Sequence, residues 1–303
     1  MKRLILLAAC LLTMSGWGQT LYERSRTYGD IEIHFDIDSV GPKGSRGVAL
    51  RIPGELNGTS LTFTLDTGAS VNVISTHFAK ALGLMAEEDS VSVKGVADGM
   101  GHRAIADELS IGNITFAHVP FLIIDAETGD AAIDQHLRHL RAVLGRPLLE
   151  ALGKLTFDFE RHNITCPERL KKQKRTKKSN LRIEDNVLML QAQSDDDTLS
   201  LIPDFGATHS NLGAEYFERH PEIAETGDSV MVYYAGVGGL VRQTEYRLHD
   251  FPLLIDGRKC PMHQITTNPS GTYESRLGMD FFSRQRRVVL DLRRWRLSIV
   301  PTS

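Results

Sequence analysis

The chain has 303 residues, of which 41% are hydrophobic and 24% charged, and its formal net charge is -3 at pH 7. This composition is typical of a soluble globular protein and excludes a disordered chain, and the small net charge gives no indication of a nucleic-acid partner. The length exceeds one average domain, so we expect two domains or one large one.

The first residues have the layout of a secretory signal peptide. Lys2 and Arg3 precede an apolar run over residues 4–14, and small residues follow it. The run is shorter than the roughly 20 apolar residues that a membrane-spanning helix needs. We therefore expect cleavage after residue 18 and export to the periplasm or the extracellular space. Lipoprotein anchoring through Cys10 is the alternative.

Residues 47–65 have the pattern of a β-hairpin, because alternating apolar residues flank Asn57-Gly58, a pair typical of two-residue turns. The second strand ends at Asp66, and the chain turns at once through Gly68. A strand that delivers one carboxylate into a tight glycine turn is a way to present an acid. Whether Asp66 is a catalytic acid depends on whether a second acidic residue is available to pair with it.

A second copy of this pattern occurs later in the chain. Residues 199–212 repeat residues 63–74 as a strand-like run, an Asp, one residue, Gly-Ala and a hydroxyl residue, and Asp204 follows Asp66 by 204 - 66 = 138 positions. A repeat of this kind predicts two structural units built alike.

The similarity extends to the end of each half. In each half an apolar residue and a Gly precede a predicted short helix, and a final strand that contains an Asp follows it. Gly and Asp are 13 positions apart in both halves, at Gly145 and Asp158 and at Gly278 and Asp291. We expect the two halves to share these elements as well.

Each half also carries two predicted hairpins. One leads to the Asp, at residues 47–65 and 186–203, and one follows it, at residues 91–112 and 230–248. Glycines at the tips of the second hairpins bend easily and can approach a ligand closely. The tip residues, as candidates to cover a substrate from two sides, are Ala97, Asp98, Gly99, Tyr234, Ala235 and Gly236.

The segment between the halves is rich in Lys and Arg and holds no aromatic residue. Nucleic-acid binding would require aromatics among the charges, so we interpret the segment as a solvated linker.

Each half of the sequence contains a pair of motifs. The first pair is residues 66–70 (Asp-Thr-Gly-Ala-Ser) with 144–146, and the second is residues 204–208 (Asp-Phe-Gly-Ala-Thr) with 277–279. They resemble the retropepsin-like aspartic proteases, once per half and over nearly the whole mature chain. The resemblance implies an all-β fold of two barrel-like lobes with few short helices, a cleft between the lobes and a glycine-tipped hairpin over it. Both lobes on one chain is the pepsin-like arrangement, and it implies a monomer.

The predicted organisation is a signal peptide, an N-terminal lobe, a basic linker and a C-terminal lobe, at residues 1–18, 19–166, 167–183 and 184–303.

One Asp per lobe has a physical reason. Two carboxylates within a few Å of each other cannot both ionise cheaply, so they share a proton, and the pair can both take a proton from water and donate one. We expect Asp66 and Asp204 to be the catalytic pair of an aspartic endopeptidase that acts on a polypeptide. Gly68 and Gly206 allow the turns behind the carboxylates and border the substrate. The remaining residues of the two turns, as support for the site, are Thr67, Ser70, Phe205 and Thr208.

Phe205 is the main departure from the pattern, because the resemblance implies a Thr or Ser there whose hydroxyl would cross-link the lobes. Pro203 is unusual as well, since proline fits a strand only at an edge or an end. Either Phe205 fills an apolar gap, or the geometry around Asp204 has loosened. The alternative function is therefore a non-catalytic module that binds peptides or proteins.

The mature chain would keep two cysteines. Cys166 and Cys260 could form one disulfide or both be free. His136 and His139 lie on a predicted helical insertion, and we interpret them as surface residues because no third ligand of suitable spacing occurs. No metal and no cofactor is expected.

Overall fold

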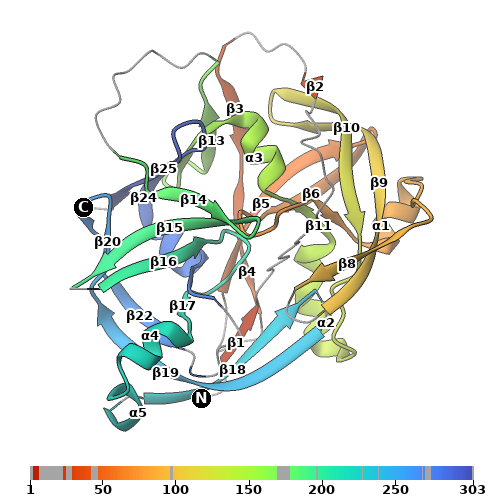
Figure 1. Cartoon of the computed structure of the whole chain (residues 1–303). Helices are drawn as coiled ribbons and strands as arrows, with labels where there is room; N and C mark the ends of the chain where they lie inside the picture. The colour runs from red at the N-terminus through yellow and green to blue at the C-terminus, as the bar shows by residue number, and fades with distance from the viewer. Residues whose placement is uncertain are drawn as a thin grey trace.

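In the computed structural model, the described residues are 3–6, 23–24, 29–41, 47–95, 98–168, 178–195, 197–226, 228–237, 239–267, 269 and 274–301. Of the predicted signal segment, only residues 3–6 are among them. Residues 169–177, most of the basic linker, and the tip residue Ala97 lie outside the described residues. Strands dominate the fold, and the few helices are short (Figure 1).

The first lobe is a sheet that closes on itself. Its nine strands among the described residues are β2 (Glu23–Arg24), β4 (Asp36–Val40), β5 (Gly47–Leu56), β6 (Thr59–Leu65), β7 (Val73–Ile74), β8 (Ser90–Lys94), β9 (Asp98–Ile111), β10 (Ile114–Ile123) and β11 (Ala142–Leu144). Their order is β2-β10-β7-β11-β6-β5-β9-β8, with β4 on β5. Because β10 also pairs with β9, the strands from β10 round to β9 form a barrel.

The second lobe is the larger sheet. Its eleven strands among the described residues are β1 (Arg3–Leu6), β14 (Leu181–Glu184), β15 (Val187–Ser194), β16 (Asp197–Pro203), β17 (Asn211–Leu212), β18 (Asp228–Gly236), β19 (Gly239–Phe251), β20 (Leu254–Ile255), β21 (Arg258–Lys259), β22 (Met262–Thr267) and β23 (Arg276–Leu277). Their order is β1-β18-β19-β22-β17-β23-β16-β15-β20-β21, with β14 on β15. The hairpin β18–β19 extends beneath both lobes to the region of β8 (Figure 1).

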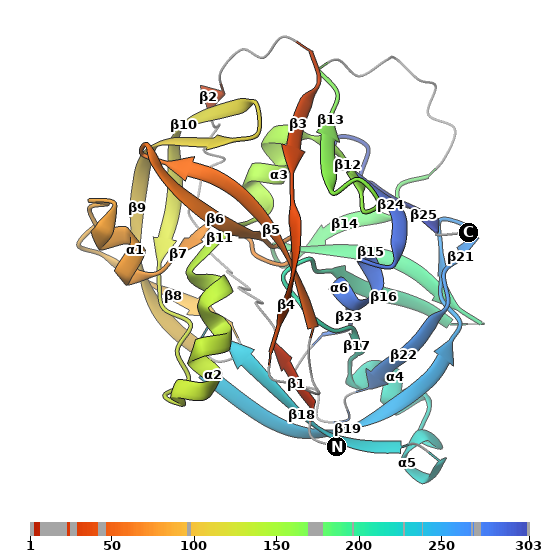
Figure 2. The same ribbon diagram turned by 180° about the vertical axis from the view of Figure 1, so that it is seen from behind.

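A third sheet joins the two lobes. It contains β25 (Arg296–Pro301), β24 (Gln285–Asp291), β12 (Lys154–Asp158), β13 (Asn163–Cys166) and β3 (Ile31–His34), in that order. β12 of the first half pairs antiparallel with β24 of the second, so the two equivalent strands of the repeat lie side by side (Figure 2). This pairing holds the halves together at the end of each repeat.

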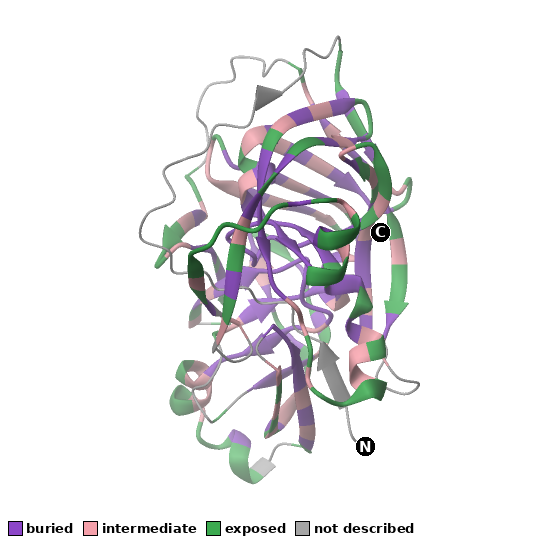
Figure 3. Cartoon of the chain, turned by 90° about the vertical axis from the view of Figure 1, so that its right-hand side faces the viewer, coloured by how far each residue is buried: buried purple, intermediate pink, exposed green. Residues whose placement is uncertain are grey.

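Local sequence explains the predicted hairpins. Asn57 and Gly58 have positive φ angles of 49° and 75°, which the turn between β5 and β6 requires and which Asn and Gly adopt most readily. The hairpin β15–β16 that leads to Asp204 is present as well. Buried residues line the interior of both lobes and the region where they meet, whereas exposed residues lie on the outer faces (Figure 3).

The helices are α1 (Thr76–Ala81), α2 (Ala131–His136), α3 (Arg146–Leu152), α4 (Ala214–Arg219), α5 (Ile223–Thr226), α6 (Met279–Phe282) and the 3-10 helix η1 (Leu137–Arg141). α3 and α6 are the short helices predicted after the two Gly residues of the repeat. Over the described residues, no helix is long and apolar enough to cross a membrane.

Candidate active site

The two Asp turns are built in the same way. Each Asp follows the end of a strand, β6 or β16, that runs parallel to the short strand from the end of its own half. The amide of Asp66 donates to the carbonyl of Leu144 at 2.9 Å, and the amide of Asp204 donates to that of Leu277 at 2.8 Å. The two halves that repeat in the sequence therefore also share this backbone hydrogen bond.

Each carboxylate is fixed by its own turn. In both, Oδ1 accepts hydrogen bonds from the amides two and three residues further on, at 2.8–2.9 Å. The four donors are Gly68, Ala69, Gly206 and Ala207. Such bonds favour the ionised form of a carboxyl group and hold its orientation.

The lobes bring the two carboxyl groups together. The negative charge of Asp204 acts directly on Asp66, and both residues are 0% exposed. A methyl group added at Gly68 would lie 2.8 Å from Cγ of Asp204, and one added at Gly206 would overlap the carboxyl of Asp66. Only glycine permits each turn to approach the opposite carboxyl this closely.

The two carboxyl groups are electrostatically unequal. Burial and the negative charge of Asp204 raise the pKa of Asp66 well above its ordinary value. Burial raises the pKa of Asp204 too, but the Arg276 guanidinium opposes the rise. The Arg276 cation therefore favours the ionised form of Asp204.

Arg276 is a residue of the site that sequence reasoning missed. Its side chain is 1% exposed, and its Nη1 lies 2.9 Å from Oδ2 of Asp204. In the repeat it stands where the first half has Val143, since 276 - 143 equals the 133 positions that separate Gly278 from Gly145. The sequence signal that could have identified Arg276 is a cation at a position where the other half has an aliphatic residue.

Thr67 and Phe205 join the lobes beneath the carboxyl groups. The Thr67 hydroxyl donates to the carbonyl of Pro203 and accepts from the amide of Phe205 at 2.9 Å, so one side chain serves two backbone groups of the other lobe. The Phe205 ring is 1% exposed and packs edge-on against Phe157 and Phe282, at centroid distances of 4.7 and 4.5 Å. Phe205 thus fills an apolar gap, the first of the two expectations. Pro203 is the last residue of β16, as proline requires.

Replacing Phe205 by the hydroxyl residue that the resemblance implies should weaken the fold. Phe205→Thr leaves a cavity between Phe157 and Phe282, and we expect a loss of about 3 kcal/mol in the free energy of unfolding. Urea denaturation measures it, with Phe217→Thr, at a half-buried ring outside the lobe contact, as the control. Unchanged or increased stability of Phe205→Thr would show that aromatic packing does not hold the lobes here.

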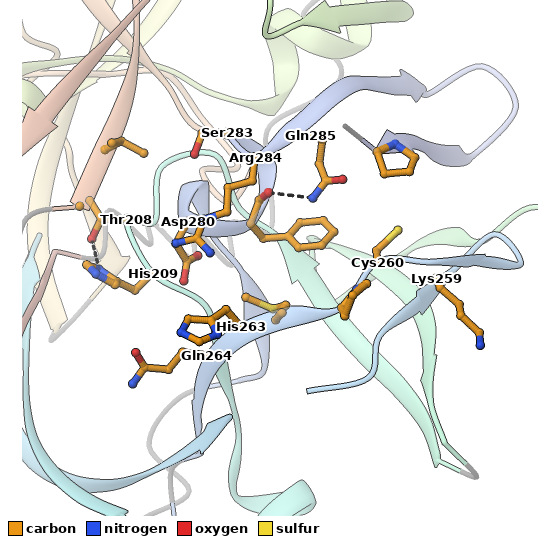
Figure 4. Close-up of a pocket in the computed structure, with 16 residues that line it drawn as sticks. Thr208, His209, Lys259, Cys260, His263, Gln264, Asp280, Ser283, Arg284 and Gln285 are labelled. Carbon is orange, nitrogen blue, oxygen red and sulfur yellow. Dashed lines mark hydrogen bonds between the residues drawn. The ribbon is translucent and has the colours of Figure 1, made fainter. Parts of the chain in front are cut away.

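Ser70 and Thr208, predicted as support, are both buried. The Thr208 hydroxyl lies 3.0 Å from Nδ1 of His209, and the Thr208 side chain packs closely against Gly47 of the first lobe. Thr208 and Gly47 border a cavity of about 580 Å³ that extends from Thr208 to Lys259 (Figure 4). Neither Asp66 nor Asp204 lines it, so this cavity is separate from the carboxyl pair.

The two glycine-tipped hairpins meet each other. A methyl group added at Gly95, at the tip of β8–β9, would lie 2.5 Å from the carbonyl oxygen of Val237, at the tip of β18–β19. Val237 and Ala235 share an apolar cluster with Val93 and Val71 of the first lobe. Both lobes therefore contribute a hairpin to this contact. The sequence had left open which one closes.

The predicted tip residues differ in their surroundings. Gly99 and Asp98 lie at the start of β9, and the Asp98 backbone pairs with Lys94. Ala235 and Gly236 are buried in β18.

Tyr234, another predicted substrate contact, is buried in the second lobe. Its side chain is 0% exposed, and its hydroxyl donates to Glu245 on the neighbouring strand. Val230, Val232 and Tyr234 alternate along β18 and face inward together.

Other sequence expectations concern metals and cysteines. Cys166 and Cys260 are both buried, and no disulfide joins them to each other. Among the residues that the structure describes, no group of three or more His, Cys, Asp or Glu side chains is arranged to hold a metal ion. His139 is not a surface residue as expected: it is buried, and burial lowers its pKa to about 4.

Parts of this chain are similar to known proteins. Residues 52–147 match the family described as aspartyl protease. Among solved structures, a similar chain is a retropepsin-like aspartic protease from Rickettsia conorii, with 19% sequence identity and a TM-score of 0.27. That match covers 50% of this chain and 95% of the other. No curated protein matches the sequence.

Proposed function

We propose that this chain, whose residues 52–147 match the aspartyl protease family, is an aspartic endopeptidase whose two lobes each supply one catalytic Asp. The observation that carries the proposal is the close approach of Asp66 and Asp204, two fully buried carboxyl groups that come from opposite lobes, each of them next to the glycine turn of the other. No structural need explains two carboxyl groups held against each other, because their mutual repulsion destabilises the fold.

The reaction follows from a singly protonated pair. A water molecule held by both side chains attacks the peptide carbonyl while the ionised carboxylate takes its proton, and the protonated Asp donates to the carbonyl oxygen. Proton return to the nitrogen then breaks the C–N bond. No covalent intermediate and no metal ion is needed. Since both Asp residues belong to one chain, a monomer would hold a complete site.

An extended polypeptide is the substrate that fits the surrounding strands. The outer edge of β18 accepts another strand, since residues Arg3–Leu6 pair with Val232–Ala235 along it. If export removes residues 1–18, as we propose, that edge becomes free for strand addition. Because the carboxyl groups are fully covered and the hairpin tips touch, the hairpins must part before a substrate enters.

The test is cleavage of an unfolded protein substrate from about pH 3 to pH 8. We expect the wild type to cut it, a statine-type inhibitor to block cleavage, a chelator to have no effect, and Asp66→Asn to be inactive. Cleavage that persists in Asp66→Asn, or that stops with the chelator, would contradict the proposal. Peptide binding by the wild type without any cleavage would favour the non-catalytic binding module instead.

A further inference from the structure

Arg276 is a fully buried charge that the reaction just described does not use. Its charged partner is Asp204, with Nη1 and Oδ2 at 2.9 Å and side-chain exposures of 1% and 0%. Within the part of the chain that the structure describes, its Nε and Nη2 atoms have no hydrogen-bond partner. Burying a guanidinium with incomplete hydrogen bonding is unfavourable, so its contact with the catalytic carboxyl needs a functional reason.

The fold holds Arg276 in place from both sides. β23 lies between β16 and β17, and Arg276 pairs with Ile202 on one and Asn211 on the other. The position is therefore fixed by backbone pairing rather than by a flexible loop. The guanidinium cannot leave Asp204 without disrupting the centre of the second lobe.

The ionisable groups around Arg276 come from four other segments. Asp204 follows β16 and forms the salt bridge. The guanidinium charge also acts on Tyr234 of β18, whose hydroxyl donates a hydrogen bond to Glu245 on β19. Glu245 also accepts a hydrogen bond from Gln243 at 2.7 Å. Asp66 faces Asp204 from the first lobe. Tyr234 and Gln243 both donate to Oε1 of Glu245, and Asp204 is the carboxylate within salt-bridge distance of Arg276.

The first lobe has no equivalent of this cation, because Val143 occupies the corresponding position. We propose that Arg276 is a built-in counter-charge that keeps Asp204 ionised, leaves the shared proton on Asp66, and shifts the working pH range of the pair towards acid. This inference rests on the proposed function. It assigns Asp204 as the base that takes the proton from water and Asp66 as the acid that donates to the carbonyl oxygen.

The direction of the pH effect follows from charge. A fixed cation favours each loss of a proton from the pair, so it lowers both ionisation steps. Both the acidic and the alkaline limbs of the pH–activity profile then lie at lower pH than they would without it. Removing the cation should move both limbs up together. A purely structural arginine would change stability without moving them.

Titration of the wild-type chain tests the inference without any need for activity. With ¹³C-labelled Asp carboxyls assigned through Asp66→Asn, the lower ionisation step should appear on Asp204 and the upper step on Asp66. The reverse order, or an equal division of both steps between the two residues, would overturn the inference. This measurement also decides the matter if the Arg276 variants do not fold.

Three variants then separate charge from structure. Arg276→Met should raise both steps, and both limbs of the activity profile, by about 1 to 3 pH units, whereas Arg276→Lys should keep them near their wild-type positions. Arg51→Met, which removes a mostly buried guanidinium bonded to the carbonyl of His139, should leave them unmoved. Steps that stay in place in folded Arg276→Met would refute the inference.

The same data distinguish the two proposals. Cleavage by a wild type whose titration order is reversed removes the role of Arg276 and leaves the peptidase assignment intact. The expected order in a wild type that does not cleave leaves the counter-charge in place and removes the peptidase.

Discussion

Gly206→Ala should reduce peptide cleavage by a factor of about 100 or more, the cost of displacing catalytic groups by roughly 1 Å. The added Cβ would overlap the carboxyl group of Asp66 at a distance that real Cβ atoms essentially never show. That carboxyl cannot yield easily, because the amides of Gly68 and Ala69 hold its Oδ1 atom. Either the Asp66 carboxyl rotates out of these bonds or the lobes separate.

Two further glycine variants calibrate this effect. Gly68→Ala creates the milder contact, 2.8 Å to Cγ of Asp204, so we expect a smaller loss of activity than with Gly206→Ala. Gly58→Ala, at a turn with φ of 75° and open space around it, should lower stability by about 1 to 2 kcal/mol and leave activity unchanged. Steady-state kinetics and urea denaturation measure both quantities. Full activity of Gly206→Ala would mean that the two turns do not approach each other in the working enzyme.

Asp66→Asn and Asp204→Asn should both be inactive but should differ sharply in stability. Asp204→Asn leaves the buried guanidinium of Arg276 without its counter-ion, and breaking a buried pair in this way costs about 3 to 5 kcal/mol. No such cation acts on Asp66, and a neutral Asn in its place avoids the cost of either protonating this buried carboxyl group at pH 7 or ionising it next to Asp204. We expect Asp66→Asn at pH 7 to be at least as stable as the wild type.

The pH dependence of stability should differ as well. The pKa of Asp66 in the folded chain is raised above its ordinary value of 3.8, so its contribution to stability is complete below about pH 3.8 and is lost as the pH rises towards the folded-state pKa. Asp66→Asn should lack this decline. Urea midpoints measured at several pH values compare the three proteins, and equal destabilisation by the two variants at pH 7 would contradict the asymmetry.

The parts of the site that depend on local sequence could be predicted. Alternating apolar residues, Asn57-Gly58 and the tight glycine turns define short elements whose geometry their own residues determine. Because the pattern occurs twice, the pairing of Asp66 with Asp204 could be inferred from sequence. The parallel bond from each Asp amide to the later strand follows from the same repeat.

Features that depend on contacts between the halves were out of reach. The register of Phe157 opposite Val288 in the joining sheet, and the meeting of Gly95 with Val237, involve residues far apart in sequence with no local signal for each other. The contact between Phe205 and Phe157 across the lobes is of the same kind. Side-chain packing in three dimensions determines all of them.

Two features of the second lobe could have been read from the sequence. Tyr234 lies on the same side of its strand as Val230 and Val232, so the alternation already indicated that its ring is buried. Arg276 is the equivalent of Val143 in the repeat, since each lies two residues before the Gly of its half. The apolar residue in the first half indicates a buried position, so a charge at Arg276 would have to be buried. A buried charge next to a pair of carboxyl groups is an indication of function.

The most direct test of the two-lobed site is the cleavage rate of an unfolded polypeptide by four samples: wild type, Asp66→Asn, Asp204→Asn and an equimolar mixture of the two variants. If both Asp residues act within one chain, the wild type cleaves while each variant and their mixture remain inactive. Recovery of activity in the mixture would place the paired carboxyl groups on different chains, and activity in either single variant would mean that the pair is not the catalytic group.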